Sequence, residues 1–232
     1  MSAEFSGTYQ DRNGREIIVI ESDGRRMRTN IRGVIFEGVS FDDFSLAPES
    51  SSGQRAIAGE NFRFNGDTLC DCRIRIRIPV TVFRGETSVA INASDAWLSV
   101  DLMLGVPADH GGIDGLELRL RLYHTGLSGL RKKMYSSGRV DSFEDGLQKI
   151  QAELSPGHSL RLCFTCALSD YWPGGAALFG GLACFRNIPE LYERVTDKQS
   201  LLKIFERHDG FVQETHVCSE FRPRAPGRGY RG

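Results

Sequence analysis

The sequence predicts an α+β protein built mainly of antiparallel β-strands, arranged as a sandwich or an open barrel, with a few short helices and a C-terminal cysteine site of the zinc type. Two observations predict the strands. Several short segments alternate apolar and charged residues, and glycine, proline and aspartate separate them without a helical pattern over about 120 residues. A third observation, the gathering of cysteines in the last third of the chain, predicts the site.

Composition limits the function classes. A chain of 232 residues with 40% hydrophobic and 25% charged residues can bury a full core, and its net charge of −1 gives no general attraction to nucleic acid or anionic membrane. No apolar run approaches the ~20 residues that span a bilayer, and the polar N-terminus lacks the apolar segment of a secretion signal. We therefore expect a cytoplasmic protein with no membrane partner, whose six cysteines are thiols or metal ligands.

The first half predicts a run of strands. Residues 8–36 alternate as in a β-meander, and residues 46–53 are expected to form a loop. The strongest strand pattern covers residues 70–83, with isoleucines on one face and Arg73, Arg75 and Arg77 on the other. These arginines form either an anion-binding or nucleic-acid-binding face or the solvated side of an amphipathic strand. The second interpretation is favoured because half-buried antiparallel strands ordinarily carry charge on one face.

Further elements follow in order. Pro79 predicts a bend or an edge, and more strands are expected at residues 89–91, 97–104 and 116–123. Residues 126–138 predict a connection with a solvated basic run at 131–133, followed by a helix that begins at an Asp141 N-cap. Two short helices are expected at residues 187–195 and 197–207. The organisation is a β-rich region, 1–135, and an α+β region, 136–232, within one compact unit.

The chemistry concentrates between residues 162 and 218. Cys163 and Cys166 form a C-x-x-C pair, and Cys184 and Cys218 complete a set of four thiolates for zinc. Because residues three apart on a flat strand face opposite sides, this site requires the chain to turn after Cys163. Zinc would join the loop to a final strand expected at 215–220, and His216 could replace one thiolate. The alternative is that the cysteines pack as small hydrophobic residues, which is also the simplest interpretation of Cys70 and Cys72.

Two neighbouring segments are candidates for binding or catalysis. Tyr171 and Trp172 lie in a glycine-rich loop and predict either a partner-binding tip or a packed Ω-loop. Cys166, Asp170 and His216 are the types of residue that a thiol hydrolase uses, although no motif fixes their geometry.

The C-terminal tail is rich in arginine, with Arg222, Arg224, Arg228 and Arg231 among glycines, prolines and aromatic residues. One interpretation is a flexible arm that binds RNA or an acidic partner. The other is a tail that packs back on the glycine-rich loop, with its arginines paired to acids such as Asp170. The two interpretations make opposite predictions for the exposure of these side chains.

The segments CFTCALSDYWPGGAALFGGLACFR and ETHVCSEFRPRAPGRGYRG, with DGRRMRTNIRGVIFEG, resemble a bacterial family of unknown function that is frequent in actinobacteria. The resemblance spans most of the chain, and its most specific motifs lie in the C-terminal third. It implies that Cys163, Cys166, Cys184 and Cys218 are family features and that GRGYRG is an integral terminus. It implies no activity, and the segment WPGG departs from the Ser-Pro version associated with the family.

The sequence favours a non-catalytic binding protein with a structural zinc site, an accessory or immunity-type factor whose partner is another bacterial protein. It contains no P-loop, no G-x-S-x-G, no H-E-x-x-H and no paired-carboxylate pattern. A thiol- or zinc-dependent hydrolase is the alternative. Nucleic-acid binding through the arginine-rich tail comes third. The partner, any substrate and the oligomeric state do not follow from the sequence.

Overall fold

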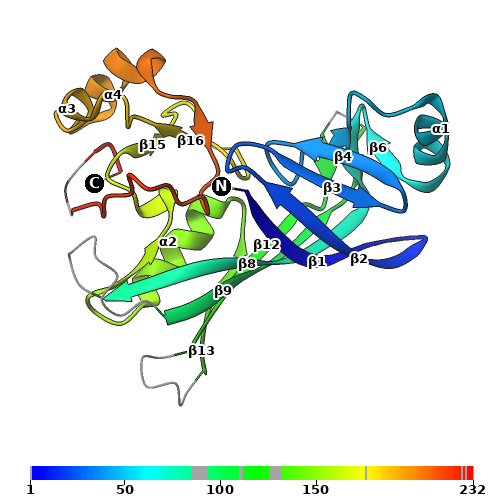
Figure 1. Ribbon diagram of the computed structural model, residues 1–232, viewed down its shortest axis with the longest axis horizontal. Helices are drawn as coiled ribbons and strands as arrows, with labels where there is room; N and C mark the ends of the chain where they lie inside the picture. The colour runs from blue at the N-terminus through cyan, green and yellow to red at the C-terminus, as the bar shows by residue number, and fades with distance from the viewer. Residues whose placement is uncertain are drawn as a thin grey trace.

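The computed structural model describes residues 2–84, 94–109, 112–125, 132–175, 177–225, 227 and 229–231 (Figure 1). The strands of its main sheet are β1 (Ala3–Asp11), β2 (Gly14–Ser22), β3 (Met27–Ile31), β4 (Val34–Gly38), β5 (Ser45–Leu46), β6 (Arg63–Asn65), β7 (Thr68–Cys70), β8 (Cys72–Arg84), β9 (Ser94–Leu104), β12 (Glu117–Thr125), β13 (Lys132–Val140) and β14 (His158–Arg161). The helices are α1 (Ser52–Asn61), α2 (Phe143–Glu153), α3 (Pro189–Tyr192) and α4 (Lys198–Ile204).

The main sheet has the order β13-β12-β9-β8-β1-β2-β3-β4-β5-β7-β6, with β14 added to β8. Its pairings among the described strands are antiparallel, which confirms the prediction of a mainly antiparallel α+β protein. The sheet is open and strongly curved, since its end strands β13 and β6 do not pair with each other. A short hairpin of β10 (Val106–Pro107) and β11 (Ile113–Asp114) lies outside it.

Strand β8 is the centre of this sheet, because its 13 residues pair with β9 along one edge and with two different strands along the other. On that second edge β1 pairs with residues 73–77 and β14 pairs with residues 81–84. Pro79 lies between the two partners. Proline has no backbone N–H to donate, so it occupies the part of the edge where no partner strand needs one.

The concave side of the sheet holds the core, and α2 packs against β12 and β13 there (Figure 1). Gly146 makes the close approach of α2 possible, because a Cβ at this position would lie 2.5 Å from Leu120 Cδ1. Phe143 on α2 packs against Phe179 and Phe41. The ring centroid of Phe179 lies 4.4 Å from that of Phe143 and 4.7 Å from that of Phe41. The three rings join the sheet, the helix and the C-terminal region in one core.

The C-terminal region, residues 162–231, adds a small antiparallel sheet in the order β15-β16-β17, made of β15 (Ser169–Tyr171), β16 (Leu182–Cys184) and β17 (Phe211–Val212). In Figure 1 it lies with α3 and α4 at the opposite end of the main sheet from α1. The predicted pair of short helices is confirmed by α3, α4 and the 3-10 turn Phe205–Arg207. No helix in the described parts of the chain is long and apolar enough to cross a membrane.

Several local predictions are wrong. The loop expected at residues 46–53 ends earlier, because Ser51 and Gln54 make a capping box and α1 begins at Ser52. The connection expected before α2 is strand β13, and the N-cap of α2 is Ser142 instead of Asp141. The strand expected at 215–220 is absent: the last strand, β17, ends at Val212, and residues 215–220 form turns and irregular chain.

Three other expectations have separate outcomes. The strand expected at 89–91, together with Arg131 of the basic run, falls outside the described residues. Cys70 and Cys72 are both buried, on β7 and β8, with Asp71 between them in the left-handed region at φ 51°. The division expected at 135/136 falls inside β13, which pairs with β12.

Candidate functional site

The predicted turn after Cys163 is present. Strand β14 ends at Arg161, and a 3-10 turn at Cys163–Thr165 brings the Cys166 N–H to the Cys163 carbonyl at 3.1 Å. Cys184 ends β16 and pairs with Ser169 of β15. Cys218 belongs to the next turn, where its carbonyl accepts a hydrogen bond from the Phe221 N–H. Four separate positions of the chain therefore bring cysteines into one part of the C-terminal region.

The electrostatics of these thiols show that they are neighbours. Burial raises the pKa of Cys163, and the nearby Cys166, Cys218 and Cys184 raise it further. Burial also raises the pKa of Cys166 and Cys184. Backbone N–H groups oppose this shift: Leu168 N donates to Cys166 Sγ at 3.5 Å, and Arg186 N lowers the pKa of Cys184. Hydrogen bonds from residue i+2 to sulfur stabilise the thiolate form at both cysteines.

The cluster is not arranged as a formed metal site. Within the described ranges, no group of three or more His, Cys, Asp or Glu side chains stands in a metal-binding arrangement. The cysteines are free thiols. His216 contributes its carbonyl to the cluster, which accepts the Cys163 N–H at 2.7 Å, but its ring lies against the turn at Gly24. A Cβ on Gly24 would be 2.2 Å from His216 Nδ1.

Asp170 is fully buried and anchors the C-terminal tail. Its carboxylate accepts hydrogen bonds from Tyr192 Oη at 2.8 Å, the Tyr230 N–H at 2.8 Å and Arg231 Nε at 2.9 Å. Arg224 adds an ion pair at 3.9 Å. At Arg224, Tyr230 and Arg231 the tail therefore packs on Asp170 and is not a flexible arm.

The other tail arginines differ from this pair. Arg222 is exposed and lies 3.7 Å from Glu193, whereas Arg228 lies outside the described residues. Arg231 also stacks over the Tyr171 ring, with its guanidinium carbon 4.9 Å from the centroid. The tail is thus held by the mostly buried Arg224 and Arg231, whereas Arg222 forms its contact at the surface.

Two of the three residues of the hydrolase alternative, Asp170 and His216, interact with other residues. Asp170 pairs with the tail arginines, and His216 interacts with Asp23 and the nearby Arg25 and Arg186, which change its pKa together with burial. Burial has the largest effect and lowers the pKa of His216. No hydrogen bond among the described residues joins Cys166, Asp170 and His216. The geometry gives this trio no shared reaction site.

Glu214 is a buried carboxylate that sequence reasoning missed. It accepts hydrogen bonds from Gly180 N at 2.6 Å, Gly181 N at 3.4 Å and Tyr171 Oη at 3.1 Å. Burial outweighs these donors and raises its pKa to about 7. The same contacts bury Tyr171, so this half of the predicted loop tip packs into the core. A single glutamate in an irregular segment gives no sequence signal for such a role.

Trp172 forms the exposed half of the loop tip and part of an aromatic patch. The patch consists of Trp172, Leu202, Phe205, His208 and Phe211. Trp172 and Phe211 are 41% and 45% exposed, and their ring centroids lie 4.6 and 6.2 Å from that of Phe205. The His208 ring is 4.8 Å from Phe211, and Leu202 lies one helical turn before Phe205. The sequence analysis identified Trp172 but missed Phe211, which only the fold brings beside it.

Comparison with known proteins identifies a family. A model of a family of unknown function, DUF6304, matches residues 3–169. The chain belongs to this family. The match covers the main sheet, α2 and the Cys163–Cys166 turn, and it ends before Cys184 and Cys218. No curated protein and no solved structure matches the chain. The predicted resemblance to a family of unknown function is thereby confirmed.

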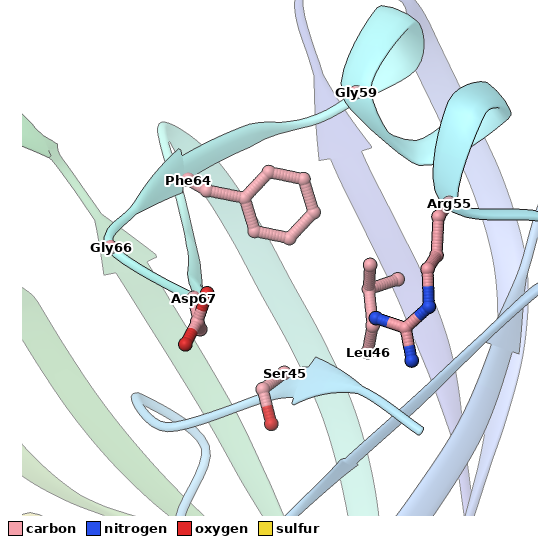
Figure 2. Close-up of a pocket in the computed structure, with 7 residues that line it drawn as sticks. All are labelled: Ser45, Leu46, Arg55, Gly59, Phe64, Gly66 and Asp67. Carbon is pink, nitrogen blue, oxygen red and sulfur yellow. The ribbon is translucent and has the colours of Figure 1, made fainter. Parts of the chain in front are cut away.

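The DUF6304 segment also contains a cavity of about 410 Å³ at the far end of the main sheet (Figure 2). Figure 2 shows the Phe64 ring and the Arg55 side chain reaching into it from β6 and α1. Arg55 donates to the carbonyl oxygens of Ser50 and Pro48, at 3.2 and 3.3 Å. The Arg55 guanidinium therefore holds the loop before α1. The aromatic patch and the cysteine cluster remain the stronger candidates for a functional site.

Proposed function

We propose that the protein is a non-catalytic binding protein, an accessory or immunity-type factor that engages another protein in the reducing cytoplasm. The observation that carries the proposal is the aromatic patch. Exposed Trp and Phe side chains that pack on a buried neighbour supply large apolar contact area with little loss of side-chain entropy. Scattered apolar residues on a surface need no explanation, but a contiguous aromatic group does.

The surroundings of the patch favour a partner of defined chemistry. Lys203 and Arg207 are exposed beside it, with Glu206 as the neighbouring acid. Phe205 is buried beneath the exposed rings, so the patch is presented by a rigid base. An apolar centre with a charged rim is the usual anatomy of a protein interface. The proposed partner has an apolar pocket for Trp172 or Phe211 and acidic groups around it.

The second part of the proposal is a structural zinc site formed by Cys163, Cys166, Cys184 and Cys218. The donor set suits zinc, since four thiolates are the commonest ligands of closed structural sites. Burial raises the pKa of Cys166 and Cys184, and the N–H donors on both cysteines act in the opposite direction, toward the thiolate form that zinc requires. Closing on the ion requires the thiol side chains to move together. Zinc would then cross-link the segments that present the aromatic patch.

Elemental analysis of purified, untagged protein tests the zinc site. We expect one zinc per chain, lost in both Cys184→Ser and Cys218→Ser. Cys72→Ser is the matched control, because Cys72 is a buried thiol of the main sheet that lies outside the cluster. A wild-type protein without metal after expression in zinc-supplied cells contradicts the site, and so does full zinc retention in both cluster variants.

A photo-crosslinking amino acid at Phe211 tests the patch. Ile57 on α1 is the matched control, because it is exposed to 46% and Phe211 to 45%. In cells that carry the native gene we expect one discrete adduct from position 211 and none from position 57. The partner, identified by mass spectrometry and purified, should bind Trp172→Ala at least about tenfold more weakly than wild type.

Two results contradict this interface. Equal crosslinking from positions 211 and 57 shows that the patch is not selective. Unchanged affinity of the purified partner for Trp172→Ala shows that the partner binds elsewhere. Sedimentation of the purified protein separates a further case, in which the adduct is a second copy of the same chain.

A further inference from the structure

The second uncovered surface is the convex face of the main sheet, opposite α2 and the small sheet (Figure 1). Alternation along each strand places one set of side chains on it. Arg77 of β8 lies on this face between Ser6 of β1 and Ser99 of β9. Arg121 of β12 pairs with Ser99 from the other side. These residues form one row across the strands.

This arginine row (Ser6, Arg77, Ser99, Arg121 and Ser136) contains no acidic residue. Among the side chains that the structure describes, neither Arg77 nor Arg121 forms an ion pair. The adjacent row is different, because Asp101 there pairs with Arg73 at 2.6 Å and with Arg75 at 3.4 Å. The acid on this part of the face is thus already neutralised, and the row keeps two cations available for an external anion.

The face is hollowed at this row. A depression of about 400 Å³ is lined by Gly7, Ile17 and Ile76 together with the polar residues Ser6, Thr8, Arg15, Arg75, Arg77 and Ser99. It combines guanidinium groups with hydroxyl groups and has no carboxylate in its lining. Guanidinium and hydroxyl donors in one concavity form the donor set that recognises phosphate oxygens.

An aromatic pair borders the same row. Trp97 stacks on Tyr123, with ring centroids 5.2 Å apart and an interplanar angle of 12°. Each ring lies two residues along its strand from the row, Trp97 from Ser99 and Tyr123 from Arg121. Aromatic side chains beside a line of cations are the combination that single-stranded nucleic acids use, because bases stack while phosphates pair with arginine.

We propose that the convex face binds single-stranded nucleic acid without sequence preference. Arg77 and Arg121 lie two strands apart, about 10 Å at the usual strand spacing, so each can pair with a different phosphate of one bound strand. The hydroxyls of the row donate to the same backbone, and Trp97 and Tyr123 provide the surface for a base. The net charge of −1 gives the whole chain no general attraction to nucleic acid, so binding depends on this local group of cations. Arg224 and Arg231 of the tail, which pair with Asp170, take no part.

Fluorescence anisotropy of end-labelled, mixed-sequence strands of about 20 nucleotides tests the proposal, with RNA, DNA and duplex DNA as separate arms. We expect Arg77→Ser with Arg121→Ser to weaken single-strand binding at least about tenfold. The slope of log K against log salt should fall by about 1.4, because each lost phosphate contact removes about 0.7 for a single strand. Trp97→Leu should weaken binding and leave the slope unchanged.

Arg26→Ser with Arg194→Ser is the control, because it removes the same charge from two exposed positions outside the arginine row and the aromatic patch. This variant should bind within about twofold of wild type. Equal losses in both double variants overturn the proposal, since they show non-specific attraction. No binding of any strand at low salt also overturns it, as does preference for the duplex. Thermal melting of each variant confirms that it is folded, and none of these outcomes affects the test of the aromatic patch.

Discussion

The main sheet and the C-terminal region are held together in different ways. In the sheet, alternating side chains divide cleanly: the core face is apolar, and charges such as Arg73 and Asp101 meet on the solvated face. In the C-terminal region, charged groups are inside. Asp170 is completely buried and pairs with the mostly buried Arg231, and Glu214 is buried beside Tyr171. The region has its own hydrophobic cluster, which includes Phe185, Tyr192 and Phe205, and the buried polar contacts add specific links between its short elements.

This difference matters for function because the two proposed surfaces depend on it differently. The convex face is carried by long paired strands, so a change in its exposed side chains leaves the fold intact. The aromatic patch is carried by short elements whose positions depend on buried polar contacts. Loss of one of those contacts should disturb the patch without unfolding the sheet.

The largest expected effect comes from Asp170→Asn. The substitution removes the carboxylate that Arg231 Nε contacts at 2.9 Å and leaves this mostly buried guanidinium without its ion-pair partner, which costs about 3–5 kcal/mol. Hydrogen exchange should show lost protection in β15 and in the tail, with β8 and β9 unchanged. Glu193→Gln is the control, since Glu193 is an exposed acid beside Arg222. Protection lost equally across both regions would show that the two do not differ in this way.

A smaller effect concerns pH and Glu214. Burial raises its pKa from 4.5 to about 7, so the folded protein binds this proton more tightly than the unfolded chain. The contribution to stability is full below pH 4.5 and is lost as the pH rises through 7, with a slope of at most about 1.4 kcal/mol per pH unit.

The measurement is urea unfolding of wild type and Glu214→Gln between pH 4.5 and 8. The variant lacks the titrating group, so the free energy of unfolding of wild type relative to the variant should fall as the pH rises through this range. A difference that is constant with pH would mean that Glu214 titrates near its ordinary value. Protonation of Glu214 would then contribute nothing to the free energy of unfolding in this pH range.

The smallest effect is expected at Arg222. Its side chain and that of Glu193 are more than half exposed and 3.7 Å apart, so solvent screens the pair. Arg222→Ser should change the free energy of unfolding by no more than about 0.5 kcal/mol. A loss comparable with that of Asp170→Asn would show that the whole tail, and not its two buried arginines, holds the region.

The sequence by itself determined the features that depend on neighbouring residues. The alternation from Cys72 to Phe83 placed the isoleucines inside and the arginines outside β8, as the structure has them. The spacing of Cys163 and Cys166 required a turn, and a 3-10 turn is present. Local patterns failed where two local signals competed, as at α1, where serines and a proline indicated a loop but the Ser51 capping box starts a helix.

Only the tertiary structure decided which distant groups meet. Asp170 and Arg231 are 61 positions apart, and Tyr171 and Glu214 are 43 apart. Phe211 joins Trp172 only because both pack on Phe205. Asp101 lies opposite Arg75 on the neighbouring strand and pairs with it, and this register leaves Arg77 and Arg121 without an ion pair to Asp101. Periodicity reports the face on which a side chain lies, whereas its partner is fixed by strand order and register, which a single strand does not encode.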